Sequence, residues 1–76
     1  MTPLTKTERD VIEYLRRESK GRRPITWRAI GRDVWGWYGF ELGESEHQLV
    51  RQTVCNIRHK LGARAIRTEF GLGYVA

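Results

Sequence analysis

With 76 residues, of which 39% are hydrophobic, the chain is long enough for one small domain with a single core, spanning residues 1–76. No apolar run approaches the ~20 residues that a membrane-spanning helix needs, and no signal peptide opens the chain, so we expect a cytoplasmic protein without a membrane partner. The single cysteine excludes an internal disulfide, and the net charge of +5 favours a polyanionic partner such as nucleic acid.

The first predicted element is a helix over residues 5–20. Thr5 and Glu8 have the spacing of a capping box, in which each side chain bonds the other residue's backbone N–H. Apolar residues follow at helical spacing, and Gly21 fits a C-terminal cap.

A second helix is predicted over residues 27–35. Thr26 can cap its first turn, Ile30 belongs to its inner face, and Gly36 stops it. In the preceding loop, Ile25 is a candidate for a very short strand.

The segment 36–43 contains three glycines, which predicts a loop. Its aromatic side chains Trp37, Tyr38 and Phe40 have two interpretations, and both stay open. They fold back on the first helix, or they form a contact surface for another protein, with RNA polymerase the first candidate.

A third helix is predicted over residues 46–61, with Ser45 as its N-cap and Gly62 at its end. Apolar residues recur at spacings of four, three and four, which indicates one buried stripe: Val50, Val54, Ile57 and Leu61. The other faces are mostly polar or cationic, with no acid after Glu46.

The chain ends in a predicted hairpin over residues 65–76, with a strand at 65–68, a turn at 70–73 and a returning strand at 74–75. The fold class is therefore mainly α with a small β part. Three helices and a C-terminal β-hairpin wing are the layout of a winged helix-turn-helix.

The basic excess coincides with the last helix and the hairpin. Residues 1–46 carry nine Lys or Arg and eight Asp or Glu, whereas residues 47–76 carry five and one. A solvated surface could have this composition, but the coincidence favours DNA contact by these two elements.

Four motifs, in register over residues 4–74, resemble the C-terminal effector domain of OmpR/PhoB-type response regulators: Thr5-x-x-Glu8, Val34-Trp35-Gly36, Ile57-Arg58-His59-Lys60-Leu61-Gly62 and Ile66-Arg67-Thr68-x-x-Gly71-x-Gly73-Tyr74. The resemblance implies a bacterial or phage transcription regulator that binds specific double-stranded DNA. The helix 46–61 would enter the major groove, and the hairpin 65–76 would lie over the adjacent minor groove.

The resemblance also implies contact residues. Base-edge or groove contacts fall on Gln48, Arg51, Gln52, Thr53, Cys55, Asn56 and Arg58. Phosphate contacts fall on Trp35, Thr68 and Tyr74, and sometimes on the position of Trp27. The basic hairpin residue Arg67 is a further candidate for DNA contact.

The chain departs from the pattern of that family at several of these positions. Relatives usually have an acid where Arg51 stands, and basic residues where Trp27, Cys55, Asn56 and Phe70 stand. The DNA sequence that is recognised must therefore differ. We expect Phe70 to pack on DNA sugars or on the protein surface, with a wedge between bases and an inward position as alternatives.

No catalytic constellation is visible, so we expect no enzyme activity and no cofactor. Cys55 and His59 could share a metal, but two ligands beside Arg51 make no closed site, and we expect none. No receiver domain precedes the first helix within these residues, so we expect a free-standing regulator, favoured by Met1, or an excised domain.

The expected partner is double-stranded DNA, with RNA polymerase as a further candidate. The expected state is a monomer in solution or a weak dimer on DNA repeats. The alternative function is a protein-interaction module that contacts RNA polymerase or another transcription protein through the loop 36–43.

Overall fold

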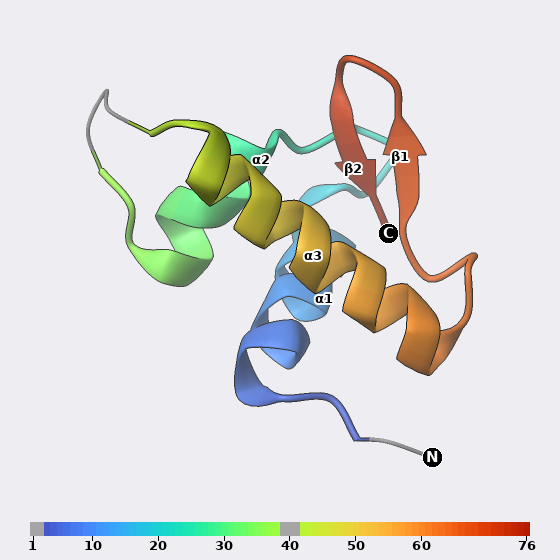
Figure 1. Cartoon of the computed structure of the whole chain (residues 1–76). Helices are drawn as coiled ribbons and strands as arrows, with labels where there is room; N and C mark the ends of the chain where they lie inside the picture. The colour runs from blue at the N-terminus through green and yellow to red at the C-terminus, as the bar shows by residue number, and fades with distance from the viewer. Residues whose placement is uncertain (1–2, 39–41) are drawn as a thin grey trace.

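The computed structural model describes residues 3–38 and 42–76. Its elements follow one another as α1 (Lys6–Glu18), α2 (Trp27–Ile30), a π-helical turn η1 (Gly31–Trp35), α3 (Glu44–Leu61), β1 (Arg67–Glu69) and β2 (Gly73–Val75) (Figure 1). Because η1 continues α2, the described residues form three helical segments and a C-terminal hairpin. The winged helix-turn-helix layout predicted from the sequence is confirmed.

Helix α1 begins with the predicted capping box. The backbone N–H of Glu8 donates to the Thr5 hydroxyl at 3.1 Å, and the N–H of Thr5 donates to the Glu8 carboxylate at 2.9 Å. The helix ends at Glu18, two residues earlier than predicted, because Ser19 rather than Gly21 forms its C-cap. The Ser19 hydroxyl also accepts the backbone N–H of Ala76 at 3.0 Å, which fastens the end of β2 to α1.

The second helical segment covers the predicted range 27–35, with Thr26 as its cap: the Thr26 hydroxyl accepts the N–H of Ala29 at 3.2 Å. Its second half widens into η1, where the Gly31 carbonyl accepts the N–H of Trp37 at 3.1 Å. The ring of Trp37 lies over Gly31 so closely that a Cβ there would be 2.3 Å from it. The segment ends at Gly36, as predicted, and the backbone of this glycine lies in the left-handed region.

Helix α3 begins at Glu44, two residues before the predicted start. The predicted N-cap at Ser45 is wrong, because this residue lies inside the first turn and Gly43 takes the cap position without a side-chain bond. The helix ends as predicted at Gly62, whose N–H donates to the Arg58 carbonyl at 2.8 Å.

The wing is an antiparallel hairpin in which Thr68 pairs with Tyr74. The predicted short strand at Ile25 is confirmed as a bridge to Tyr74, with N···O distances of 2.8 and 2.9 Å. Two details of the prediction are wrong: β1 begins at Arg67 rather than at residue 65, and Gly73 belongs to β2 rather than to the turn.

The core lies between the three helical segments and β2. Its fully buried side chains come from α1, α2, α3 and the residue just before β1: Val11, Ile12, Leu15, Ile30, Val50, Val54, Ile57 and Ile66. Leu61, the predicted fourth member of the α3 stripe, is 44% exposed, because it is the last residue of α3. No helix in the described ranges is long and apolar enough to cross a membrane.

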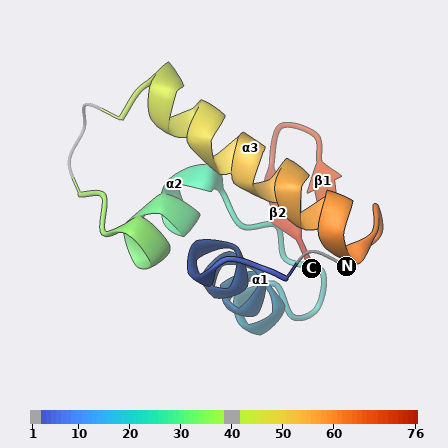
Figure 2. The same cartoon turned by 60° about the horizontal axis from the view of Figure 1, so that its bottom comes forward.

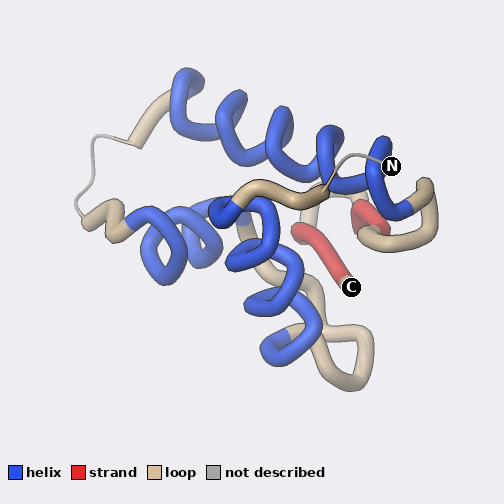
Figure 3. Tube along the Cα trace, turned by 90° about the horizontal axis from the view of Figure 1, so that it is seen from below, coloured by secondary structure: helices blue, strands red, loops and turns tan. Residues whose placement is uncertain are grey.

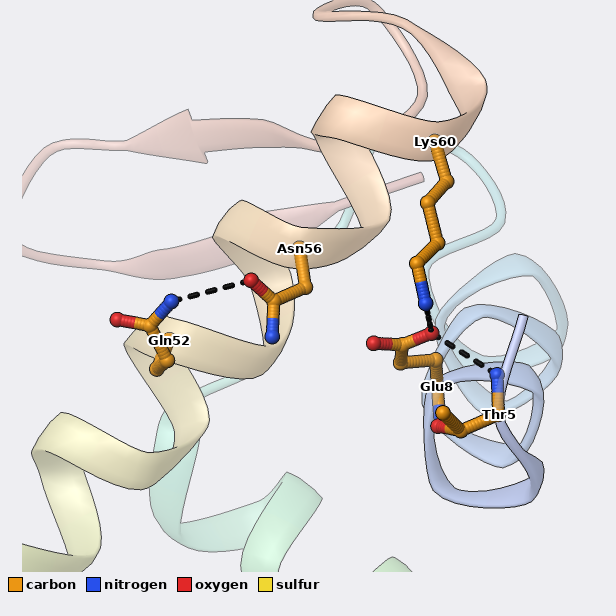
Figure 4. A network of polar contacts seen from close by, with 5 residues as sticks. All are labelled: Thr5, Glu8, Gln52, Asn56 and Lys60. Atoms are coloured by element: carbon orange, nitrogen blue, oxygen red, sulfur yellow. Dashed lines mark hydrogen bonds and ion pairs between the residues drawn. The ribbon is translucent and has the colours of Figure 1, made fainter. Parts of the chain in front are cut away.

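Helix α3 has one covered side and one free side. Figures 2 and 3 both show α1 and α2 on the same side of α3, and no described element covers the opposite side. On the covered side, the ammonium of Lys60 lies 2.6 Å from the Glu8 carboxylate, which joins the end of α3 to the start of α1 (Figure 4). The fold thus leaves the outer face of α3 open beside the hairpin.

Candidate nucleic-acid interface

The outer face of α3 carries most of the contact residues predicted from the sequence. Gln48, Arg51, Gln52 and Cys55 are exposed, and Asn56 is half-buried. The amide of Gln52 donates to the side-chain carbonyl of Asn56 at 3.0 Å, so these two predicted contacts lie side by side (Figure 4). The acids of α3 are confined to its first turn, so the rest of this face is neutral or cationic.

Arg58 connects the helix to the wing. Its Nε donates to the carbonyl of Ile66 at 2.8 Å, and its terminal nitrogen donates to the hydroxyl of Thr68 at 2.6 Å. A guanidinium bonded to two points of a short hairpin fixes the position of that hairpin. The half-buried Arg58 therefore differs from the exposed Arg51, which makes no such bond within the described residues.

Tyr74 lies behind these two arginines at the junction of α3 and the hairpin. Its side chain is 8% exposed, and burial raises the pKa of its hydroxyl, while the positive charges of Arg51 and Arg58 oppose that rise. The hydroxyl forms no hydrogen bond within residues 3–38 and 42–76, and because no buried side-chain oxygen or nitrogen there lacks a partner, this oxygen is accessible from outside the protein. A phosphate oxygen is a partner that the two nearby guanidinium groups would attract.

Arg67 lies on the other face of the hairpin. Neighbouring residues on a strand point to opposite faces, so Thr68 faces α3 and Arg67 faces away from it. Arg67 lies 2.6 Å from the Glu69 carboxylate and lines a hollow with Arg22 and Arg64. The structure therefore does not bring Arg67 together with the other predicted contacts.

A groove of about 390 Å³ lies between α2, α3 and the turn of the hairpin. Trp27 and His47 stack on one side of it, with ring centroids 4.8 Å apart, and the guanidinium of Arg28 lies 4.7 Å from the centre of the Trp27 ring. Sequence reasoning did not name Arg28 or His47 as contacts. The position of Arg28 in the first turn of a helix capped by Thr26 could have identified it, because helix N-termini often contact phosphates.

Two predicted contact residues point into the protein. Thr53 is 7% exposed, and its hydroxyl donates to the carbonyl of Leu49 at 2.8 Å. Trp35 packs against the core and stacks on Trp37, with ring centroids 5.0 Å apart. Its phosphate contact stays a prediction.

The comparison with protein families decides what kind of domain this surface belongs to. The family described as "Transcriptional regulatory protein, C terminal" matches residues 1–76. The chain belongs to this family. No curated protein and no solved structure matches it.

Membership in the family of transcriptional regulatory C-terminal domains makes the chain a DNA-binding, OmpR/PhoB-type domain of a transcription regulator. Such a domain does not belong to a class of enzymes. Within residues 3–38 and 42–76, no three His, Cys, Asp or Glu side chains lie close enough to hold a metal, and the cysteine Cys55 is free and exposed.

The aromatic residues of the loop after η1 differ in their burial. Trp37 is half-buried, packs against the core and lies over Gly31, and its contact with another protein stays a prediction. Tyr38 is 78% exposed and is available for a contact, as the prediction requires. Phe40, the third residue named for this surface, lies outside the described residues.

Proposed function

We propose that the domain binds specific duplex DNA, with α3 in the major groove and the hairpin at the adjacent minor groove. The single observation that carries this proposal is the outer face of α3, which is exposed, free of acids after its first turn, and fixed to the hairpin through Arg58. A helix of ordinary diameter fits the major groove, and Arg, Gln and Asn are the side chains that pair with base edges there.

The geometry divides the contacts into two roles. Gln48, Arg51, Gln52 and Cys55 are exposed where bases would lie, with Asn56 beside them. Thr68, Tyr74, Arg28 and His47 are among the residues that line the groove along which a phosphate backbone would run, and Glu69 is the acid in that lining.

Three predicted contacts change their assignment in this proposal. Arg58 acts as a positioning residue, since two of its nitrogens are bonded to the hairpin. Thr53 is left out because its hydroxyl is bonded inside α3, and Arg67 because it faces away from α3.

The experiment that tests the proposal is selection of bound duplexes from a random library, followed by titration at several salt concentrations. Four to six neutralised phosphates would give a slope of roughly −4 to −5 for log affinity against log salt. An enriched sequence with such a slope supports specific binding. A flat salt dependence, or no binding at low salt, contradicts it.

A matched pair of variants tests the assigned surface. Arg51→Ala and Arg16→Ala each remove one positive charge, but Arg16 is exposed on α1, which packs on the covered side of α3. We expect Arg51→Ala to weaken binding to the selected duplex more than Arg16→Ala does. Equal effects of the two variants would show that only total charge matters.

A second candidate function is contact with RNA polymerase, for which the 78% exposure of Tyr38 is the supporting observation. The test is Tyr38→Ala in a DNA-binding assay and in a polymerase capture assay. The candidate requires unchanged DNA affinity and weaker capture, and loss of DNA binding would contradict it. The selected sequences also test the oligomeric state on DNA. A weak dimer on DNA would select a repeated half-site, whereas a monomer would select a single site.

A further inference from the structure

The tip of the wing carries two exposed apolar side chains. Phe70 is 99% exposed and Leu72 is 63% exposed. The N–H of Leu72 donates to the Glu69 carbonyl at 2.9 Å, which closes a four-residue turn, and Gly71 has a φ of 76°, which a larger residue adopts only with strain. Phe70 is therefore held at the corner of a defined turn with its ring in solvent. The alternative that the Phe70 side chain points into the protein is wrong.

The hairpin behind this tip is braced on both strands. Two hydrogen bonds join Tyr74 of β2 to Ile25. The backbones of Gly73 and Ile25 are so close that a Cβ on Gly73 would lie 2.3 Å from the Ile25 carbonyl oxygen. On the side of β1, Arg58 bonds both Ile66 and Thr68. An aromatic ring on a loosely attached hairpin would be pushed away by stacked base pairs. A ring on a hairpin that is fixed to the rest of the domain can instead stay in place and separate them.

The tip is continuous with the proposed DNA surface. Gly71 and Leu72 line the same groove as Arg28, His47 and Thr68. A nucleic-acid backbone in that groove would therefore pass directly beside Leu72 and Phe70. The concentration of basic residues in 47–76 favours a polyanion over a protein as the occupant.

We propose that Phe70, supported by Leu72, inserts between two base pairs from the minor groove and kinks the duplex. The proposal rests on the proposed DNA binding. Apolar wedges of this kind partly unstack a base step, and pyrimidine–purine steps such as TA and CA unstack most easily. The wing then recognises how easily the DNA deforms, whereas an arginine at the same position would be attracted to a narrow, stiff A-tract.

The test uses the selected duplex with 2-aminopurine, whose fluorescence rises on unstacking, placed at each step beneath the wing in turn. Binding is followed separately by anisotropy of an end label. With the wild-type chain we expect a fluorescence rise at one pyrimidine–purine step, and the rise is lost in Phe70→Ala and retained in part in Phe70→Leu. Phe70→Ala weakens binding roughly tenfold when the step is TA and less than about twofold when an A-tract replaces it.

Two control variants separate the wedge from general effects. Phe70→Arg keeps binding, steepens the salt slope by about one unit and loses the fluorescence rise, because it adds a charge and removes the ring. Tyr38→Ala removes an exposed aromatic ring elsewhere and leaves every signal unchanged.

Each other outcome overturns one claim only. If the wild-type chain binds the duplex without unstacking at any step, or if Phe70→Ala keeps the full rise, then the wedge is wrong and the proposed function stands. Absence of binding in the anisotropy assay contradicts the proposed function itself. If sedimentation shows self-association without DNA that Phe70→Ala abolishes, the tip is an interface between copies and the wedge is wrong.

Discussion

Replacement of Glu8 by glutamine tests whether the ion pair with Lys60 holds α1 against α3. The two side chains are 7% and 17% exposed, and their charged atoms are 2.6 Å apart. Removal of one partner from a buried pair costs about 3–5 kcal/mol, and the residual exposure of Lys60 lowers the expected loss to roughly 2 kcal/mol. The amide oxygen of glutamine still accepts the N–H of Thr5, so the variant keeps most of the helix cap.

For a domain of this size, roughly 2 kcal/mol corresponds to a fall of about 8–16 °C in melting temperature. Thermal melting at neutral pH is measured for Glu8→Gln, Lys60→Met and the double variant, which form a double-mutant cycle. We expect the double variant to lose less than the sum of the single losses by at least about 1 kcal/mol. Additive losses would refute the view that the two charges stabilise each other.

The same pair predicts a dependence on pH. The hydrogen bond from Lys60, and next the one from the backbone N–H of Thr5, hold the pKa of Glu8 below its ordinary value of 4.5. A folded pKa below the unfolded one gives stability that is present above about pH 4.5 and is lost as the pH falls through the lowered value. The melting temperature of the wild-type chain should therefore fall more steeply on acidification than that of Glu8→Gln, and parallel curves would contradict this.

Three further predictions concern packing, a buried tyrosine and base recognition. Gly31→Ala puts a Cβ 2.3 Å from the Trp37 ring, so we expect a loss of about 1–3 kcal/mol and a changed near-ultraviolet circular dichroism spectrum, whereas an unchanged melt would contradict the packing. Burial and the hydrogen bond to Asp33 raise the pKa of Tyr14 to about 12. The free energy of unfolding of the wild-type chain, measured in urea titrations, should therefore fall as the pH rises from 10.0 to about 12, and Tyr14→Phe should lack this pH-dependent loss. Arg51→Ala should cost about 1–3 kcal/mol on the selected duplex and relax its base preference, whereas equal losses on all sequences would make Arg51 a phosphate contact.

Local spacing was sufficient to predict the first turn of α1. Thr5 and Glu8 are three residues apart, so the capping box is visible in the sequence, and the structure contains it. The pair of Glu8 with Lys60 joins residues 52 positions apart, and no pattern along the chain indicates it. For the same reason the stripe of α3 was extended one member too far, to Leu61, since spacing does not show where the packing partner ends.

The sequence was sufficient to predict which face of α3 is exposed, but not which side chains on it are free to contact DNA. The polar face of α3 follows from its helical period, and the structure exposes it. The same period cannot show that Thr53 bonds its own helix, or that Arg58 is held by the hairpin, because both depend on neighbours in three dimensions. Among the aromatic residues, Trp37 and Tyr38 are adjacent in the sequence, yet Trp37 packs against the core and Tyr38 is exposed.

The role of Arg58 links the two halves of the proposed DNA recognition. Its bonds to Ile66 and Thr68 fix the base of the wing to the last turns of α3, and the bridge of Ile25 to Tyr74 fixes the other strand. A tip held in this way cannot slide along the duplex independently of the bases that α3 contacts. The deformable step beneath the wing must then stand at one constant distance from the bases under α3 in every selected sequence. A hairpin attached only by its chain ends would accept several spacings, and Arg58→Ala, which removes both bonds of that side chain, should broaden the spacing before it abolishes binding.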